Sequence, residues 1–483
     1  MPASSMELLK VTLILLCCIS FGLGKTNPDA ITFLPGLTKQ PSFSQFSGYL
    51  TGTGGKMLHY WFVTSQSKPA SDPLVLWTNG GPGCSSMLGI LTENGPFTIQ
   101  PDGVTLAYND NSWNKFANVL YLESPAGVGF SYSPDGNVTT SDDLITEDHY
   151  TALLDFYKKY PTYTKNQLFL IGESYSGVYT PLLAKKVIDA IDKGTFVAPF
   201  TGFAVGNGVT NYEYLANSLI YLLFYHGIIG RRLWDALQKD CCTGPSDCNF
   251  YNTTSANCTA DVSQAHSLLA GLNPYNILAD CAGGAPHQKV LNKDRSFRYI
   301  PEFDLMYRGT TIGKLMRQKF QSTPINKLGV TPPCLNYTSL STYLNNEYTK
   351  TALHIKTGLP SWEPCSAAVS MKYVQIYKDL SQVYRDILSN LQHQVRILVY
   401  NGDLDTACNF LGNQWFVDAL GAEDEVQWRP WIFSDGSDQI AGFVKEYHNI
   451  AFVTVKGAGH MAPEDKPVAT SLLISNFLSN KPY

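Results

Sequence analysis

The sequence predicts an α/β protein with a mostly parallel central sheet covered by helices. Short and nearly continuous apolar runs recur along the chain, and such runs are typical of strands buried on both faces. Helical patterns lie between several of them, for example at 148–160 and 180–192, which favours parallel strands joined through helices. The expected strands are Met57–Val63, Leu74–Trp77, Val119–Leu122, Leu168–Ile171, Phe203–Val205, Val395–Tyr400 and Ala451–Val455.

The length of the chain, 483 residues, exceeds what one simple core supports, so we expect a large domain with an inserted lobe. Between residues 206 and 334 the sheet-like runs become scarce and cysteines cluster. This change in sequence pattern indicates a cap domain at 206–334, inserted into a core formed by 25–205 and 335–483.

The composition and the first residues bear on partners and compartment. Charged residues make up 16% of the chain and the net charge is -5, so we expect no overall positive electrostatic potential that would attract nucleic acid. Lys10 precedes a short apolar segment, 11–24, which predicts a secretory signal peptide at 1–24. The alternative is an uncleaved anchor. No later run reaches membrane-spanning length, so we expect no membrane span after signal removal and a secretory, lysosomal or extracellular location.

Glycosylation and cysteine signals agree with that compartment. Nine of the 11 cysteines lie outside the signal, and this odd number leaves one thiol outside any set of disulfides. The group between Cys241 and Cys258 is typical of small local disulfide loops, while the competing zinc site lacks a histidine or a second C-x-x-C. Four sequons predict N-glycans at Asn137, Asn252, Asn257 and Asn336.

The segment Gly172–Gly177, G-E-S-Y-S-G, directly follows an expected strand and predicts a nucleophile elbow. Such a turn is packed tightly and holds the serine in a strained conformation, so side chains at Gly172 and Gly177 would clash. Ser174 would then be presented at the sheet edge as an acyl-transfer nucleophile. The alternative is an ordinary Gly/Ser turn.

A serine nucleophile needs a histidine base and an acid that orients it. The strand that ends at Tyr400 leads into Asp403 and Asp405, and the last expected strand leads into His460. The order serine, acid, histidine is that of α/β-hydrolases. Spacing does not choose between the two aspartates, either of which could be a turn residue, and His460 could be a loop histidine.

The glycine-rich turn Asn79–Cys84 follows another expected strand. It predicts an oxyanion hole in which the N–H of Gly81 joins that of Tyr175, because a glycine-rich backbone can approach the developing charge closely. The alternative is a plain turn, and no Gly-Lys-Ser/Thr follows to make it a phosphate loop. We expect no metal and no cofactor.

Three motifs, Trp77–Ser86, Gly172–Gly177 and Gly459–Met461, together resemble the serine carboxypeptidases. Two further segments, Leu34–Leu37 and Glu123–Tyr132, together with the acid turn itself, resemble a lysosomal member of that family. The resemblance covers nearly all of the mature chain and is weakest at about 285–330. It implies an α/β-hydrolase fold with an inserted cap.

The resemblance also implies an activity, the release of C-terminal, hydrophobic residues from peptides with a free C-terminus through an acyl-enzyme. It assigns the triad to Ser174, Asp405 and His460, the oxyanion donors to Gly81 and Tyr175, and the binding of the substrate carboxylate to Asn79, Glu93 and Glu173. Two close carboxyl groups cannot both ionise cheaply, so Glu93 and Glu173 should share a proton, which predicts activity at acidic pH. Without the resemblance, Glu93 could be a surface helix residue.

Further expectations rest on the resemblance alone. It implies excision near 285–300, a lysosomal location, a homodimer, and partnership with lysosomal β-galactosidase and sialidase. A scaffold role or acyl transfer to an alcohol are the competing functions. The implied disulfides are Cys84–Cys365, Cys241–Cys258, Cys242–Cys248 and Cys281–Cys334, with Cys408 as the spare thiol.

Overall fold

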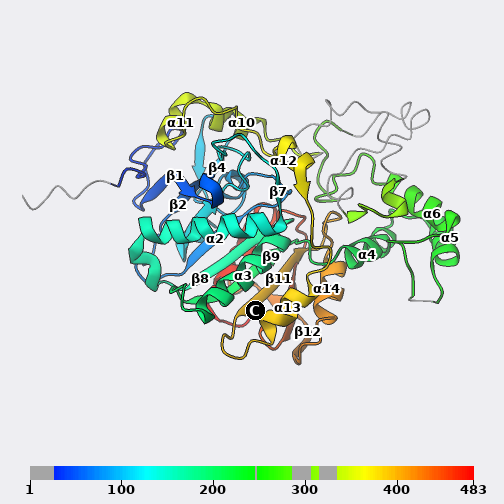
Figure 1. Cartoon of the computed structure of the whole chain (residues 1–483). Helices are drawn as coiled ribbons and strands as arrows, with labels where there is room; N and C mark the ends of the chain where they lie inside the picture. Colours follow the sequence, from blue (N-terminus) through cyan, green and yellow to red (C-terminus); the bar gives the residue numbers. More distant parts are fainter. Residues whose placement is uncertain (1–26, 245–246, 285–305, 315–333) are drawn as a thin grey trace, which may run out of the picture.

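The computed structural model of the chain describes residues 27–244, 247–284, 306–314 and 334–483, so the expected signal peptide and the segment 285–300 lie outside the described residues. A ten-stranded sheet forms the centre of the molecule (Figure 1), in the order β1-β2-β6-β3-β8-β9-β11-β14-β13-β12. Its strands are β1 (Gln45–Thr51), β2 (Met57–Val63), β3 (Leu74–Thr78), β6 (Asn118–Leu122), β8 (Leu168–Glu173), β9 (Phe200–Gly206), β11 (Arg396–Gly402), β12 (Asp424–Ile432), β13 (Ile440–Tyr447) and β14 (Ile450–Val455).

The middle of the sheet is parallel from β6 through β3, β8, β9 and β11 to β14, and both ends are antiparallel. The predicted α/β class with a mostly parallel sheet is therefore confirmed, and all seven expected strands are present with small shifts at their ends. The prediction missed β1, β12 and β13. These strands lie at or near the edges, and β12 is largely exposed, so its sequence carries no continuous apolar run.

Helices cover both faces of the sheet. Alternate residues of β8 show this directly, because Leu168 and Leu170 belong to one apolar core while Phe169 and Ile171 belong to the other. The first core is closed by α2, α3 and α13, and the second by α16. The helices are α2 (Asp142–Lys159), α3 (Ser176–Asp192), α4 (Tyr212–Tyr225), α5 (Arg231–Cys241), α6 (Ala256–Ser267), α10 (Thr338–Asn345), α11 (Glu347–Ala352), α12 (Ala367–Lys372), α13 (Ser381–Leu388), α14 (Phe410–Asp418), α15 (Ala462–Asp465) and α16 (Pro467–Ser479).

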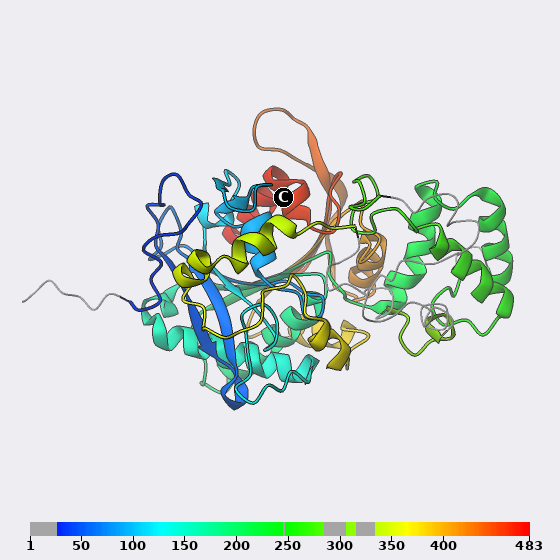
Figure 2. The ribbon, with the colours of Figure 1, turned by 90° about the horizontal axis from the view of Figure 1, so that it is seen from above.

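Helices α4, α5 and α6 project to one side of the sheet (Figures 1 and 2) and belong to the segment expected as a cap, whose bounds stay a prediction. Short pairs β4 (Phe97–Ile99) with β5 (Leu106–Tyr108), and β7 (Thr140–Ser141) with β10 (Tyr373–Val374), complete the sheets of the described residues. Within those residues, no helix is both long and apolar enough to cross a bilayer.

Four disulfides join the same cysteine pairs that the resemblance implies. Two of them lie in the α5–α6 region, so no thiolate of that cysteine group is left for zinc, and Cys408 is buried outside the four bonds. The asparagines of all four sequons are exposed, and their glycosylation stays a prediction.

Candidate active site

Ser174 lies in the tight turn between β8 and α3. Its φ is +65°, a conformation that non-glycine residues rarely adopt and that stores strain at functional positions. The flanking glycines leave room for this turn. A Cβ on Gly172 would lie 2.0 Å from Oγ of Ser176, and one on Gly177 would lie 2.6 Å from the backbone N of Val209. The turn has the geometry expected of a nucleophile elbow.

The carboxyl ends of the parallel strands bring the predicted catalytic residues to one edge of the sheet. Ser174 directly follows β8, Asp405 follows β11 by three residues, and His460 follows β14 by five. Ser174 is 7% exposed and His460 4% exposed, so both are largely shielded from solvent. The register of this edge is fixed by the pairs Glu173 with Gly206, Tyr400 with Gly206, and Gly402 with Val455.

The structure distinguishes the two candidate aspartates. Asp405 is fully buried, and its Oδ2 lies 2.7 Å from Nδ1 of His460. The same carboxylate accepts hydrogen bonds from Nδ2 of Asn207, at 2.9 Å, and from two backbone N–H groups that follow it. Asp403 instead accepts a hydrogen bond from the N–H of Gly457 and stabilises a turn. Asp405 is thus the carboxylate that can orient the imidazole through Nδ1, which leaves Nε2 for proton transfer.

The glycine-rich turn Asn79–Cys84 lies against the elbow. A Cβ on Gly80 would be 2.2 Å from the backbone N of Tyr175, so only glycine permits this approach. Gly81 has a φ of +110°, and the turn is closed by a hydrogen bond from the N–H of Cys84 to the carbonyl of Gly80. The backbone of Gly81 and that of Tyr175 are therefore neighbours, as an oxyanion hole requires.

Buried carboxyl groups lie beside the nucleophile. Glu93 is 3% exposed, so the alternative of a surface helix residue is wrong. It ends a π-helical turn, η2 (Gly89–Glu93), and its Oε1 accepts a hydrogen bond of 3.0 Å from Nδ2 of Asn79. The orientation of Asn79 is fixed because its Oδ1 accepts from Nε1 of Trp77, at 2.7 Å, and from the N–H of Gly89. One oxygen of Glu93 and one of Glu173 are buried without a hydrogen-bond partner.

The pKa values of this pair are displaced. Burial raises the pKa of Glu93, against the lowering effect of its hydrogen bonds to Glu173 and Asn79. Burial, reinforced by the charge of Glu93, raises the pKa of Glu173 well above its usual range. Because the charge of Glu93 opposes a second charge on Glu173, ionising both buried groups is costly, and one of them holds a proton where isolated glutamates would be ionised.

A third carboxyl group, Glu464 of α15, was missed by the sequence analysis. The residue as a whole is exposed, but protein crowds its carboxyl group, and this desolvation together with the charge of Glu93 raises its pKa to about 8. Its charge in turn raises the pKa of Glu173. Its position four residues after His460 was the only signal in the sequence, because packing of α15 against η2 cannot be deduced from spacing.

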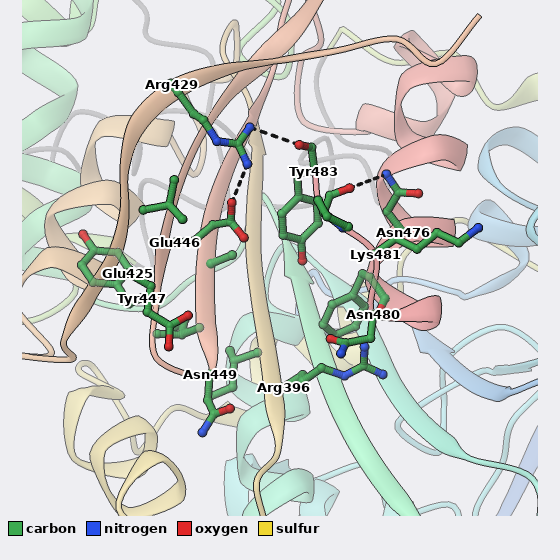
Figure 3. Close-up of a pocket in the computed structure, with 16 residues that line it drawn as sticks. Arg396, Glu425, Arg429, Glu446, Tyr447, Asn449, Asn476, Asn480, Lys481 and Tyr483 are labelled. Atoms are coloured by element: carbon green, nitrogen blue, oxygen red, sulfur yellow. Dashed lines mark hydrogen bonds and ion pairs between the residues drawn. The ribbon is translucent and has the colours of Figure 1, made fainter.

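Two pockets differ in their volume and in the residues that line them. A small pocket beside Ser174 has apolar walls that include Val209, Leu215 and Met306. A larger one, of about 430 Å³, is lined by residues of β11 to β14 and of the chain segment after α16 (Figure 3), and no predicted site residue lines it. There Arg429 is held by Glu446 at 2.6 Å. The volume of a pocket therefore does not identify the active site, whereas the residues that line it do.

Comparison with known proteins agrees with this geometry. The model of the family described as serine carboxypeptidase matches residues 35–480. The chain belongs to the serine carboxypeptidase family. It is 46% identical to lysosomal protective protein of Mus musculus over 491 residues, with 100% of both chains covered. It is 37% identical to a serine carboxypeptidase of Caenorhabditis elegans, ctsa-4.1, with 99% of each chain covered.

The fold of this serine-type carboxypeptidase also has a solved counterpart. The crystal structure of Kex1(delta)p, a prohormone-processing carboxypeptidase from Saccharomyces cerevisiae, superposes with a TM-score of 0.71 at 21% identity, covering 95% of this chain and 97% of that one. The predicted α/β-hydrolase fold is confirmed.

Proposed function

We propose that this carboxypeptidase removes single C-terminal residues through an acyl-enzyme on Ser174. His460 takes the proton of the serine hydroxyl, and Asp405 holds the imidazole through Nδ1 and stabilises the imidazolium. The N–H groups of Gly81 and Tyr175 bind the oxyanion that forms on the scissile carbonyl. The imidazolium then protonates the leaving amino acid, and water hydrolyses the ester.

The observation that carries exopeptidase polarity is the position of the carboxyl pair. Glu173 immediately precedes the nucleophile, and Glu93 and Asn79 complete a buried group of hydrogen-bonding atoms next to it. A protonated glutamate can donate a hydrogen bond to the carboxylate of a peptide, whereas an ionised one would repel it. The terminal residue is thereby held so that its peptide bond reaches Ser174.

Acidic working conditions follow from the same pair. Because the pKa values of Glu93 and Glu173 are raised, the protonated form persists well above the ordinary range of glutamate and is lost as the pH rises further. Substrate binding should therefore be strong in acid and weaken toward alkaline pH. We propose a lysosomal location, which this acid dependence and the likeness to the mouse lysosomal protective protein support.

The apolar pocket beside Ser174 is suited to the side chain on the acyl side of the scissile bond. Its walls include Val209, Tyr212 and Leu215 from the β9–α4 segment and Met306. Burying an apolar side chain there gains about 25 cal/mol for each Å² removed from water. Because the volume of this pocket is only about 10 Å³, we propose a preference for peptides with small apolar penultimate residues.

Partner proteins are a separate proposal. The edge strand β12 exposes Trp428 and Ile432, and β13 beside it exposes Phe443, which offers an apolar edge for a second copy of the chain. The family resemblance implies lysosomal β-galactosidase and sialidase as further partners, and we propose them on that ground. Light scattering of the purified chain, alone and mixed with each glycosidase, tests both ideas.

The decisive experiment is digestion of a defined peptide mixture at acidic pH, followed by mass spectrometry, with a fluorophosphonate label to identify the nucleophile. We expect ladders shortened from the C-terminus and a label on Ser174. Peptides with an amidated C-terminus serve as the matched control and should be cut poorly. Internal cleavage, acylated alcohols in place of ladders, or a label elsewhere would contradict the proposal.

A further inference from the structure

A second group of buried polar residues lies behind the oxyanion turn. We call it the Glu123 cluster, and every member is at most 1% exposed. It gathers residues from separate parts of the chain, namely β1, β2, the end of the oxyanion turn, the loop after β6 and the segment that precedes α12. The members are Ser47, His59, Ser85, Glu123 and Trp362.

Glu123 is the centre of this cluster because its donors come from several different segments. Its Oε2 accepts from Nδ1 of His59, at 2.8 Å, and from the N–H of Phe130, at 2.9 Å. Its Oε1 accepts from Nε1 of Trp362, at 3.0 Å, and from the hydroxyl of Ser85. A buried carboxylate with four donors is fully satisfied, so its position is well defined.

Ser85 connects this carboxylate to the active site. It directly follows Cys84, the last residue of the oxyanion turn, and its N–H donates to the carbonyl of Pro364 at 2.9 Å. Its hydroxyl oxygen also accepts from Nε1 of Trp362 at 3.1 Å. The turn is further held by the Cys84–Cys365 disulfide and by a hydrogen bond from the N–H of Ser366 to the carbonyl of Gly83, at 2.8 Å.

We propose that Glu123 is a positioning residue for the oxyanion hole. Through Ser85 and Trp362 it fixes the end of the turn that carries Gly81, so that the Gly81 N–H is aimed before charge develops on the substrate. Such aiming matters because an oxyanion hole acts through donors that need no reorganisation during the reaction. Glu123 itself touches neither the substrate nor the triad.

This inference rests on the proposed function. The experiment compares Ser85→Ala, on the turn side of the cluster, with Ser47→Ala, on the far side of His59. Each removes one buried hydroxyl, but only the first acts on the turn. We expect Ser85→Ala to lower kcat about 10-fold or more, short of the 10²- to 10³-fold typical of losing an oxyanion donor, with KM nearly unchanged. Ser47→Ala should keep the wild-type kcat.

Binding measurements separate aiming from general loosening. A peptide aldehyde forms a tetrahedral adduct on Ser174 whose oxygen occupies the oxyanion hole, so its affinity should fall with kcat in Ser85→Ala. A free C-terminal amino acid, which needs only the carboxylate site, should bind as before. Trp362→Phe, which keeps an aromatic ring but removes the N–H, should repeat this pattern.

The outcomes are distinct. If Ser85→Ala and Ser47→Ala lower kcat equally, or if product affinity falls along with aldehyde affinity, the positioning role is wrong. Ser174→Ala is assayed in parallel, because activity retained in that variant would refute the proposed function itself. If that activity is lost, the proposed function stands, and the two hydroxyl variants decide the role of Glu123.

Discussion

Two sets of serine, histidine and carboxylate stand out among the described residues, and one of the two has the features of a catalytic site. In the active site, Nδ1 of His460 lies 2.7 Å from Asp405, and in the Glu123 cluster, Nδ1 of His59 lies 2.8 Å from Glu123. The residue types and this distance are nearly the same. The difference lies in the serine and in its access.

Ser47 lies inside β1, is fully buried, and donates its hydroxyl proton to the carbonyl of Leu353 at 2.7 Å. Its oxygen also lies 2.9 Å from Nε2 of His59. The imidazole of His59 is thereby held between the hydroxyl of Ser47 and the carboxylate of Glu123. Ser174 instead has strained backbone geometry and lines a pocket. The three residue types alone therefore do not make a serine a nucleophile. Its backbone conformation and its access to a substrate pocket are also required.

The largest expected effect tests the serines directly. Ser174→Ala should lower kcat on the order of 10⁶-fold, because the nucleophile is lost, while thermal stability stays equal or rises. Ser47→Ala should leave turnover intact and destabilise the fold by about 1–3 kcal/mol, since it leaves buried partners unsatisfied. Amino-acid release and denaturant unfolding measure the two properties. Loss of activity in Ser47→Ala with a wild-type stability would overturn the distinction.

The carboxylates give the next contrast. Asp405→Asn should lower kcat about 10⁴-fold with little change in stability, because an amide no longer enforces the productive tautomer of His460. Glu123→Gln should cost about 1–3 kcal/mol of stability, because the amide nitrogen that replaces one carboxylate oxygen cannot accept the hydrogen bonds made by that oxygen. Steady-state kinetics and denaturant unfolding of both variants measure this contrast.

Asp403→Asn is the matched control for the active-site carboxylate, since Asp403 holds a turn and does not contact the imidazole. It should retain near wild-type kcat. Equal losses in Asp403→Asn and Asp405→Asn would show that the region tolerates no substitution, and the assignment of the acid would then lose its support.

The sequence was sufficient to predict the features that depend on neighbouring residues in the chain, namely the nucleophile elbow and the parallel strands. The apolar run before Gly172–Gly177 predicts strand, turn and helix together, and the steric need for those glycines is met in the structure. The parallel centre of the sheet followed from the same kind of run. The strands β1, β12 and β13 were missed because polar residues and a glycine interrupt β1, and exposed positions interrupt the apolar runs of β12 and β13.

The spacing of residues in the sequence could not predict contacts between distant segments of the chain. It left Asp403 and Asp405 equivalent, and only the packing of β11 against β14 places one of them on His460. The same limit hid Glu464 and the Glu123 cluster. Glu123 begins one of the segments that carry the family resemblance, but its donors come from segments up to 239 residues away.

A smaller effect concerns the carboxyl pair and the pH. The protonated form binds substrate, and the pKa of Glu173 is raised, so the wild-type KM should be low in acid and rise once the pH passes that raised pKa. The rise approaches tenfold per pH unit, as each unit leaves a tenth of the protonated form. Glu173→Gln keeps a donor at every pH, so its KM should stay nearly flat. Steady-state KM across the pH range measures this.

Glu93→Gln is the companion variant, and its profile should also be flattened, because either member can hold the shared proton. Since Ser174 and His460 are untouched, kcat in acid should change little in both variants. A KM that still climbs steeply with pH in Glu173→Gln would mean that another group, not this pair, governs binding of the substrate carboxylate.

The smallest expected effect is carried by Glu464. Its charge raises the pKa of Glu173, so Glu464→Gln should lower that pKa and move the rise in KM to lower pH. The same substitution in a Glu173→Gln background should have no such effect, because the group that responds is gone. A shift that persists in the double variant would place the action of Glu464 on His460 or on the substrate directly, and the buried carboxyl pair would then not be the pH-sensitive part of the site.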